Sequence, residues 1–208
     1  MSIRTSFNPM GTLGAEPPLP PGYKRAIYLR SSADQYIDTG VTVTPQTRVL
    51  LDVEFLKANT SSYNGCLQNR PLLRFTVSCS RLDDGLSVAC GGTDTELGIQ
   101  AAGIRHRVVL SGAATATVDG TPVQLNVGPP PPKKFWLFAR NQDAYWPDAF
   151  PSTQKLYRFK AWDGELLVRD MVPAVRLADG KPCMVDVLTG TPYFNLRPNA
   201  DFTTNFDE

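Results

Sequence analysis

Residues 48–55 read RVLLDVEF, and this stretch decides the fold class. Its odd-numbered positions are all large and apolar, whereas Arg48, Asp52 and Glu54 stand at even-numbered positions. A period of two with one apolar face is typical of a β-strand that buries one side. We therefore expect a strand here, with its odd-numbered side chains in the core.

The same alternation recurs along the rest of the chain. Residues 75–80 alternate cleanly. Two further segments predict half-buried strands, and their core-facing side chains are Ile104, His106, Val108 and Leu110 in one and Tyr157, Phe159 and Ala161 in the other. Residues 135–139 read FWLFA and are apolar at every position, which suits a central strand covered by the opposing sheet on one side and a loop on the other.

Turn residues support an all-β fold. The dipeptide Asp-Gly occurs at residues 84–85, 119–120, 163–164 and 179–180. Between alternating apolar runs this pair is a strong hairpin signal, because a type I′ turn needs positive φ at both central residues. No stretch follows a helical period. The sequence therefore predicts a two-sheet antiparallel sandwich of many short strands, a jelly roll or a close relative.

Composition excludes several classes of protein. The 208 residues suit one domain of sandwich size, and the 42% of hydrophobic residues are too many for a disordered chain. Lys and Arg number 21 against 20 Asp and Glu, so no bulk charge attracts nucleic acid or an anionic membrane. No apolar run approaches the length of a membrane span and no signal peptide is apparent, so we expect synthesis in the cytosol.

The cysteines carry no motif. Cys66, Cys79, Cys90 and Cys183 form no C-x-x-C pair, so neither a zinc ribbon nor a thioredoxin-like motif is predicted. Buried free thiols are the favoured interpretation in a reducing cytosol, and a cross-strand bond between Cys79 and Cys90 stays open as the alternative.

Residues 1–22 differ from residues 23–208, which form the predicted sandwich domain. The shorter segment holds five prolines and three glycines, and its apolar side chains follow no period: Ile3, Phe7, Met10 and Leu13. Such a segment cannot build a core of its own. Two interpretations remain open, a flexible tail or an extended arm whose apolar side chains dock on another subunit, with residues 16–22 as a stiff spacer.

Several blocks resemble a known family. Residues 28–40 read YLRSSADQYIDTG and residues 47–49 read TRV, which resembles the opening of concanavalin A-like, laminin-G-like jelly-roll proteins of phage and prophage genomes. Residues 155–173, KLYRFKAWDGELLVRDMVP, are similar to the closing hairpin of that family, and residues 182–186 and 193–195 to its tail. The stretch TSFNPMGTL at residues 5–13 resembles the leader of phage structural proteins.

The resemblance implies a two-sheet sandwich that serves as a binding or structural module. In phages it implies a virion accessory protein, such as a head decoration, head fibre or tail appendage protein. We therefore expect a non-enzymatic virion protein that residues 1–22 attach to capsid or tail proteins. Such a protein is made in the host cytoplasm and is expected to be a homo-oligomer, because virion sites repeat symmetrically. No acidic pattern matches a calcium rim site, so we expect neither metal nor cofactor.

Catalytic candidates are few. Asp52 and Glu54 share one strand face, but the E-x-D-x-x-E pattern of glycan hydrolases would need a carboxylate where Lys57 stands. The single histidine, His106, lies on a predicted apolar face without a nucleophile motif, which favours a hydrogen-bonded core or interface histidine. No glycine-rich nucleotide motif occurs. We expect no enzymatic activity.

The loop at residues 141–151 is the strongest candidate ligand site in the sequence. It is stiffened by proline and combines aromatic rings with polar groups, namely Asn141, Asp143, Tyr145, Trp146, Asp148 and Phe150. An apolar platform with a few fixed polar groups suits a sugar, so a carbohydrate-binding lectin or adhesin is the alternative function. The competing interpretation is that the aromatic rings cover the strand at residues 135–139 or pack on a neighbouring subunit.

Overall fold

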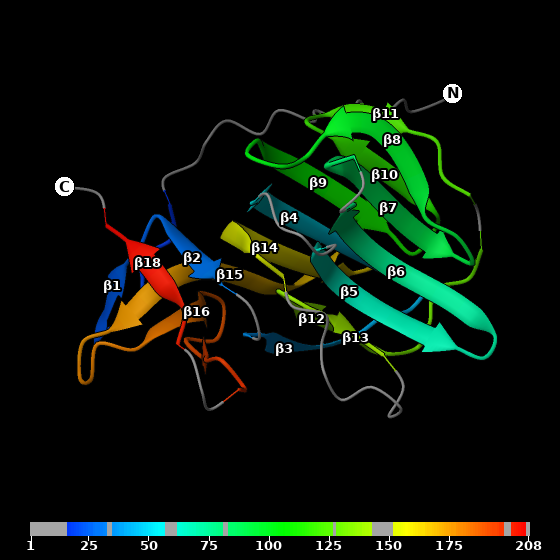
Figure 1. The fold of residues 1–208 in the computed structure, drawn as a ribbon. Coiled ribbons are helices and arrows are strands. Elements are labelled where there is room, and N and C mark those ends of the chain that lie inside the picture. The colour runs from blue at the N-terminus through cyan, green and yellow to red at the C-terminus, as the bar shows by residue number, and fades with distance from the viewer. Residues whose placement is uncertain are drawn as a thin grey trace, which may run out of the picture.

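The computed structural model describes residues 16–32, 35–56, 62–80, 83–126, 128–142, 152–197 and 201–206. These residues form two β-sheets and contain no helix, as Figure 1 shows. Accordingly, this part of the chain offers no helix capable of crossing a membrane. The prediction of an all-β chain with two antiparallel sheets is confirmed.

The larger sheet contains eleven strands. Eight of them pair in the order β11 (Thr121–Val123), β10 (Thr115–Val118), β9 (Arg105–Ser111), β4 (Thr47–Phe55), β14 (Gln154–Asp163), β15 (Leu166–Arg176), β16 (Pro182–Asp186) and β17 (Pro192–Tyr193). The three short strands off this path are β1 (Tyr23–Arg25), which pairs with β15, β2 (Tyr28–Ser31), which pairs with β14, and β18 (Thr203–Asn205), which pairs with β2.

The smaller sheet contains seven strands. Six pair in the order β3 (Ile37–Thr42), β12 (Lys134–Leu137), β5 (Ser62–Asn69), β6 (Leu72–Cys79), β7 (Gly85–Gly91) and β8 (Thr95–Gln100). The short β13 (Arg140–Asn141) pairs with β5 in parallel. As predicted for residues 135–139, β12 is central in its sheet, between β3 and β5.

The core lies between the two sheets. The four odd-numbered side chains of β4 from Val49 to Phe55 are fully buried, which confirms the alternation that decided the fold class. Phe135 of β12 links the layers, because its ring stacks on Phe159 of β14 at 5.6 Å and meets Phe75 of β6 edge-on at 5.9 Å. Aromatic contacts of this kind add to the free energy gained from burial alone.

A polar contact also crosses this core. The side-chain amides of Asn64 on β5 and Gln154 on β14 are fully buried and bind each other, with N–O distances of 2.7 and 3.0 Å. The Phe138 backbone N–H donates to the same Asn64 oxygen at 2.8 Å. Buried amides are stable only when they are paired, so this contact joins the two sheets at β5 and β14.

A second, smaller hydrophobic cluster lies on the outer face of the larger sheet, the face turned away from the smaller sheet. Ala174 of β15 and Cys183 and Val185 of β16 form it. Leu19, Tyr23 and Phe194 pack against this cluster. Leu19 belongs to the predicted N-terminal arm, so residues next to β1 pack on the sandwich.

Two side chains differ from their predicted positions. Ile104 precedes β9 and is 46% exposed, so it does not share the core face of His106 and Val108. Tyr157 was expected in the core beside Phe159, but the register of β14 against β4 shifts between Leu156 and Arg158. This β-bulge inserts one residue, so Tyr157 lies on the outer face while Phe159 stays inside.

The turn and cysteine predictions have clear outcomes. Only the turn at Asp119 and Gly120 has positive φ at both residues, 50° and 83°, as a type I′ hairpin requires. The four cysteines are buried and free. Cys90 lies opposite Phe75, and Cys79 lies opposite Leu86, so the strand register separates the two thiols and the alternative bond is absent.

Candidate binding pocket on the larger sheet

The residues that the sequence singled out lie mostly outside the described part of the chain. This holds for the arm residues Ile3, Phe7, Met10 and Leu13 and for the loop residues Asp143, Tyr145, Trp146, Asp148 and Phe150. Asn141 is described, and its side-chain amide donates to the backbone oxygen of Lys134 at 2.9 Å. The proposed sugar platform and the arm therefore stay predictions.

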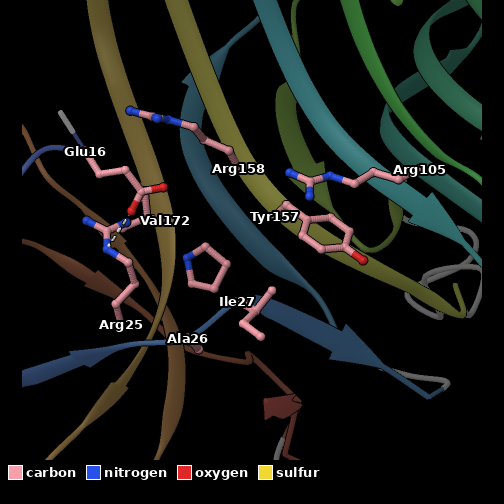
Figure 2. A pocket seen from close by; sticks show the side chains of 9 residues that line it. Glu16, Arg25, Ala26, Ile27, Arg105, Tyr157, Arg158 and Val172 are labelled. Atoms are coloured by element: carbon pink, nitrogen blue, oxygen red, sulfur yellow. Dashed lines mark ion pairs between the residues drawn. The ribbon is translucent and has the colours of Figure 1, made fainter. Parts of the chain in front are cut away.

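The structure instead shows a pocket of about 160 Å³ on the outer face of the larger sheet. Three arginines line it: Arg25 at the end of β1, Arg105 at the start of β9 and Arg158 in β14. Figure 2 shows these side chains around the pocket, with Tyr157 and Ile27 between them. We call this site the arginine pocket.

The bulge in β14 builds one wall of the arginine pocket. In a regular strand Tyr157 and Arg158 would point to opposite faces of the sheet. The shift in register after Leu156 lets both side chains line the same pocket. The lining is almost entirely polar, and its few apolar atoms come from Ile27, which follows β1, and from the buried Val172 of β15.

The carboxylate of Asp52 fixes the orientation of the Arg105 guanidinium. Its Nε and Nη2 donate to the two oxygens of Asp52 on β4 at 2.6 and 2.7 Å. Its guanidinium also lies 3.8 Å from the centre of the Tyr157 ring, a cation–π contact. The hydrogen bonds that Arg105 donates to Asp52 raise the pKa of Arg105 further above its usual range, so this side chain carries a fixed positive charge.

Arg158 is held in the same way. Its Nε and Nη2 donate to Asp170 of β15 at 2.9 and 2.8 Å, and Lys160 lies 3.2 Å from the same carboxylate. In both arginines the carboxylate therefore takes the Nε–Nη2 edge. Among the described residues, the Nη1 groups of Arg105 and Arg158 have no hydrogen-bond partner, and these are donors that the pocket can offer.

Arg25 binds the end of the N-terminal segment. Its Nε lies 3.1 Å from a carboxylate oxygen of Glu16, and its Nη2 donates to the Pro17 backbone oxygen at 2.5 Å. Figure 2 marks the ion pair between Glu16 and Arg25 at the side of the pocket. The Glu16 side chain remains 66% exposed, so this carboxylate lies at the rim.

Glu54 and Tyr157 are poor candidates for proton transfer. Burial raises the pKa of Glu54, but hydrogen bonds from Tyr157 at 2.7 Å and Lys155 at 3.0 Å bring it below its ordinary value. Burial and the same Glu54 contact raise the pKa of Tyr157. A general acid or base works best with a pKa near the working pH, so these groups suit a structural or binding role better than catalysis.

His106 confirms its prediction as a buried, hydrogen-bonded histidine. Its Nδ1 lies 2.8 Å from Asp119, in the turn between β10 and β11, and its Nε2 lies 2.8 Å from the Gln100 backbone oxygen. Both ring nitrogens are therefore occupied. Within the described ranges, no three His, Cys, Asp or Glu side chains gather in a way that could hold a metal ion.

The pocket could not be read from the sequence, because its arginines are far apart in the chain and follow no motif. The best available signal was the pair Asp52 and Glu54 on one strand face, which predicts cations on the neighbouring strands. Comparison of the chain with protein-family models, curated proteins and solved structures finds no match.

Proposed function

We propose that this chain is a non-enzymatic virion accessory protein of a bacteriophage, a concanavalin A-like sandwich displayed on the particle. One observation carries the proposal: the two blocks with the family resemblance meet in the fold. The opening block contains β2 and most of β3, and the closing block forms most of the β14–β15 hairpin. β2 pairs directly with β14, for example Arg30 opposite Lys155.

The base of the N-terminal segment supports a role in attachment. Leu19 packs on the outer cluster, Arg25 binds Glu16 and Pro17, and the Leu177 N–H donates to the Gly22 oxygen at 2.8 Å. A tether that starts from a fixed base holds the displayed domain in a defined position. Residues 1–15 then supply the apolar contacts to a capsid or tail protein.

Replacing Ile3, Phe7, Met10 and Leu13 together by Ser in the full chain tests this attachment. We expect the variant to fold as the wild type does, by circular dichroism and thermal unfolding, and to be lost from purified particles. Leu166→Ser is the control, because Leu166 is 69% exposed and lies away from the N-terminal segment, in the β14–β15 hairpin. Normal incorporation of the fourfold variant would refute the proposal.

We also propose that the protein forms homo-oligomers and that lysis of the host cell releases it. Repeated virion sites favour a symmetric assembly, which sedimentation of the purified protein or the copy number per particle can measure. A monomer present as one copy would contradict this part.

A lectin or adhesin role is the second candidate, and one contact favours it. The bond from Asn141 to Lys134 fixes the start of the loop at residues 141–151 to a central strand. A glycan array with the wild type and Trp146→Ala tests this role. Specific binding that the variant loses supports it, and an array without binding contradicts it.

A further inference from the structure

We propose that the outer face of the larger sheet, over β9, β4 and β14, is a docking surface for an acidic region of another protein. These three strands lie side by side in the sheet (Figure 1). We call this surface the cationic face, and it consists of the outward side chains of the three strands together with those of Arg30 and Asp170 next to them. It is separate from residues 1–15, which the proposed attachment uses.

Strand register shows which charged side chains share this face. Residues directly opposite each other on neighbouring strands point to the same side of a sheet. Val53 of β4 is fully buried, so the residues on either side of it point outward. Across β9, β4, β14 and β2, one outward row consists of Arg105, Glu54, Lys155 and Arg30. The next row, across β9, β4 and β14, consists of Arg107, Asp52 and Arg158. Two shorter rows pair Lys160 with Asp170 and Arg48 with Trp162.

The cationic face carries more positive charge than the chain as a whole. Its rows hold seven Lys and Arg side chains against three carboxylates, which leaves four positive charges. The whole chain has a net charge of +1, so its remaining residues are negative in sum. A surface of one sign attracts a partner of the opposite sign and steers its approach. The partner region is therefore expected to be acidic.

Several arginines of this face can still bind a carboxylate. Within the described ranges, Arg30, Arg48 and Arg107 form no ion pair, and Arg30 and Arg107 are exposed. Arg105 and Arg158 are paired, but the carboxylates take only their Nε–Nη2 edges. A guanidinium that is already oriented loses little freedom when it binds a second carboxylate. The face is therefore preorganised for carboxylates of a partner.

Aromatic rings between the cations favour a protein as the partner. The guanidinium of Arg105 lies 3.8 Å from the centre of the Tyr157 ring, and that of Arg48 lies 4.5 Å from the centre of the Trp162 ring. Tyr28 meets Tyr157 edge-on at 5.8 Å. Trp, Tyr and Arg are the residue types that contribute most to protein–protein binding. These contacts already order the side chains, so docking costs them little conformational entropy.

The carboxylates within the face disfavour a nucleic acid. Asp52 and Glu54 lie in the central strand of the three, and each has a cation on both sides in its row. A phosphate backbone is negative at every nucleotide, so it would meet these carboxylates as well as the arginines. A protein can place carboxylates opposite Arg107 and neutral or basic groups opposite Asp52 and Glu54. The alternation of charges thus matches an acidic protein region better than a polyphosphate.

The experiment is an NMR titration of the full chain with an acetylated peptide of five Glu-Ser repeats. We expect saturable shifts of the backbone amides of Asp52, Arg107 and Arg158, and none in β6 or β7 of the smaller sheet. Binding should be lost at about 0.5 M NaCl, because salt screens contacts between exposed charges. The matching peptide of Lys-Ser repeats should not bind, and a short DNA duplex tests a nucleic acid.

Two variants with the same change in net charge locate the binding. Arg107→Gln should weaken binding of the Glu-Ser peptide about threefold, because it removes an exposed, unpaired charge from the cationic face. Arg70→Gln is the matched control, since Arg70 is exposed in the turn between β5 and β6 of the smaller sheet. It should leave binding unchanged. Arg30→Gln repeats the test in a second strand if Arg107→Gln alters thermal unfolding.

Four results would overturn the inference. The first is absence of peptide binding at low salt. The second is equal weakening by Arg107→Gln and Arg70→Gln, which would show that only the overall charge matters. Shifts centred on the smaller sheet would place the binding elsewhere, and tighter binding of the DNA duplex would assign the cationic face to a nucleic acid. None of these outcomes bears on particle incorporation.

Discussion

Glu54 illustrates how single residues hold the outer face of the larger sheet together. Its carboxylate accepts hydrogen bonds from Lys155 and Tyr157, and its side chain is 15% exposed. These contacts require the ionised form. The stability that Glu54 adds must therefore depend on pH.

The pKa of Glu54 in the folded state lies below its ordinary value of 4.5. Its stabilising effect is therefore complete above that value and is lost as the pH falls through the folded-state pKa. We expect Glu54→Gln to lower the free energy of unfolding by about 1 kcal/mol at pH 7. The difference from the wild type should shrink near pH 3 in urea unfolding.

The control for this effect is Glu165→Gln, which changes an exposed side chain in the β14–β15 turn. It should cost little at either pH. An equal loss for Glu54→Gln at both pH values would contradict the assigned contacts.

The cysteines allow a second residue-level prediction. Burial raises the pKa of Cys79 to about 11 and of Cys183 to about 12, and it raises the pKa of Cys66 and Cys90 as well. A thiol reacts through its thiolate, so none of the four should react quickly with Ellman's reagent at pH 8. All four should react in urea, and a fast thiol in the native protein would contradict their burial.

Two features of strand packing, a bulge and a buried amide pair, position side chains on the outer face and in the core. The bulge in β14 moves Tyr157 to the outer face and so creates a wall of the arginine pocket. The amide pair between β5 and β14 joins the two sheets at one fixed position. Both features depend on how two strands contact each other, so neither can be assigned to one strand by itself.

Removing one partner of this amide pair should strongly lower the free energy of unfolding. Asn64→Leu leaves the Gln154 amide and the Phe138 N–H buried without their acceptor, which costs about 2–4 kcal/mol of unfolding free energy. The double variant with Gln154→Leu should recover part of that loss, because two apolar side chains leave fewer unpaired groups. Urea unfolding of both variants measures the coupling, and a purely additive result would argue against the pair.

The molecule as a whole is a two-layer sandwich with part of its N-terminal segment packed on one outer face. Leu19 makes that packing with the cluster of Ala174, Cys183 and Val185. Arg25 of β1 and residues 26–27, which follow this strand, line the arginine pocket together with residues of β9, β14 and β15. The packed part of the N-terminal segment and the arginine pocket therefore lie on the same face of the larger sheet.

Leu19→Ser should lower the free energy of unfolding by about 1 kcal/mol, because it removes apolar contact area from the outer cluster. Thermal unfolding of the full chain provides the measurement. Leu166→Ser, at a side chain that is 69% exposed, should leave the midpoint unchanged. Equal midpoints for the two variants would show that Leu19 does not hold this segment.

Sequence reasoning succeeded where the cause is local. The alternation at residues 48–55 forces one face of β4 inward, and the Asp119–Gly120 turn tolerates positive φ at both residues. It placed Tyr157 wrongly, because a bulge depends on the partner strand. The candidate pocket was missed for the same reason, and the predicted loop and arm residues lie almost entirely outside the described part of the chain.

The sequence by itself determined the fold class, the buried thiols and the buried histidine, since these follow from local alternation and from the polarity of each side chain. Only the tertiary structure decided the arginine pocket. Arg25, Arg105 and Arg158 belong to three different strands, and long-range pairing sets their register. No local pattern encodes that register, because it depends on which strands meet across the whole sheet.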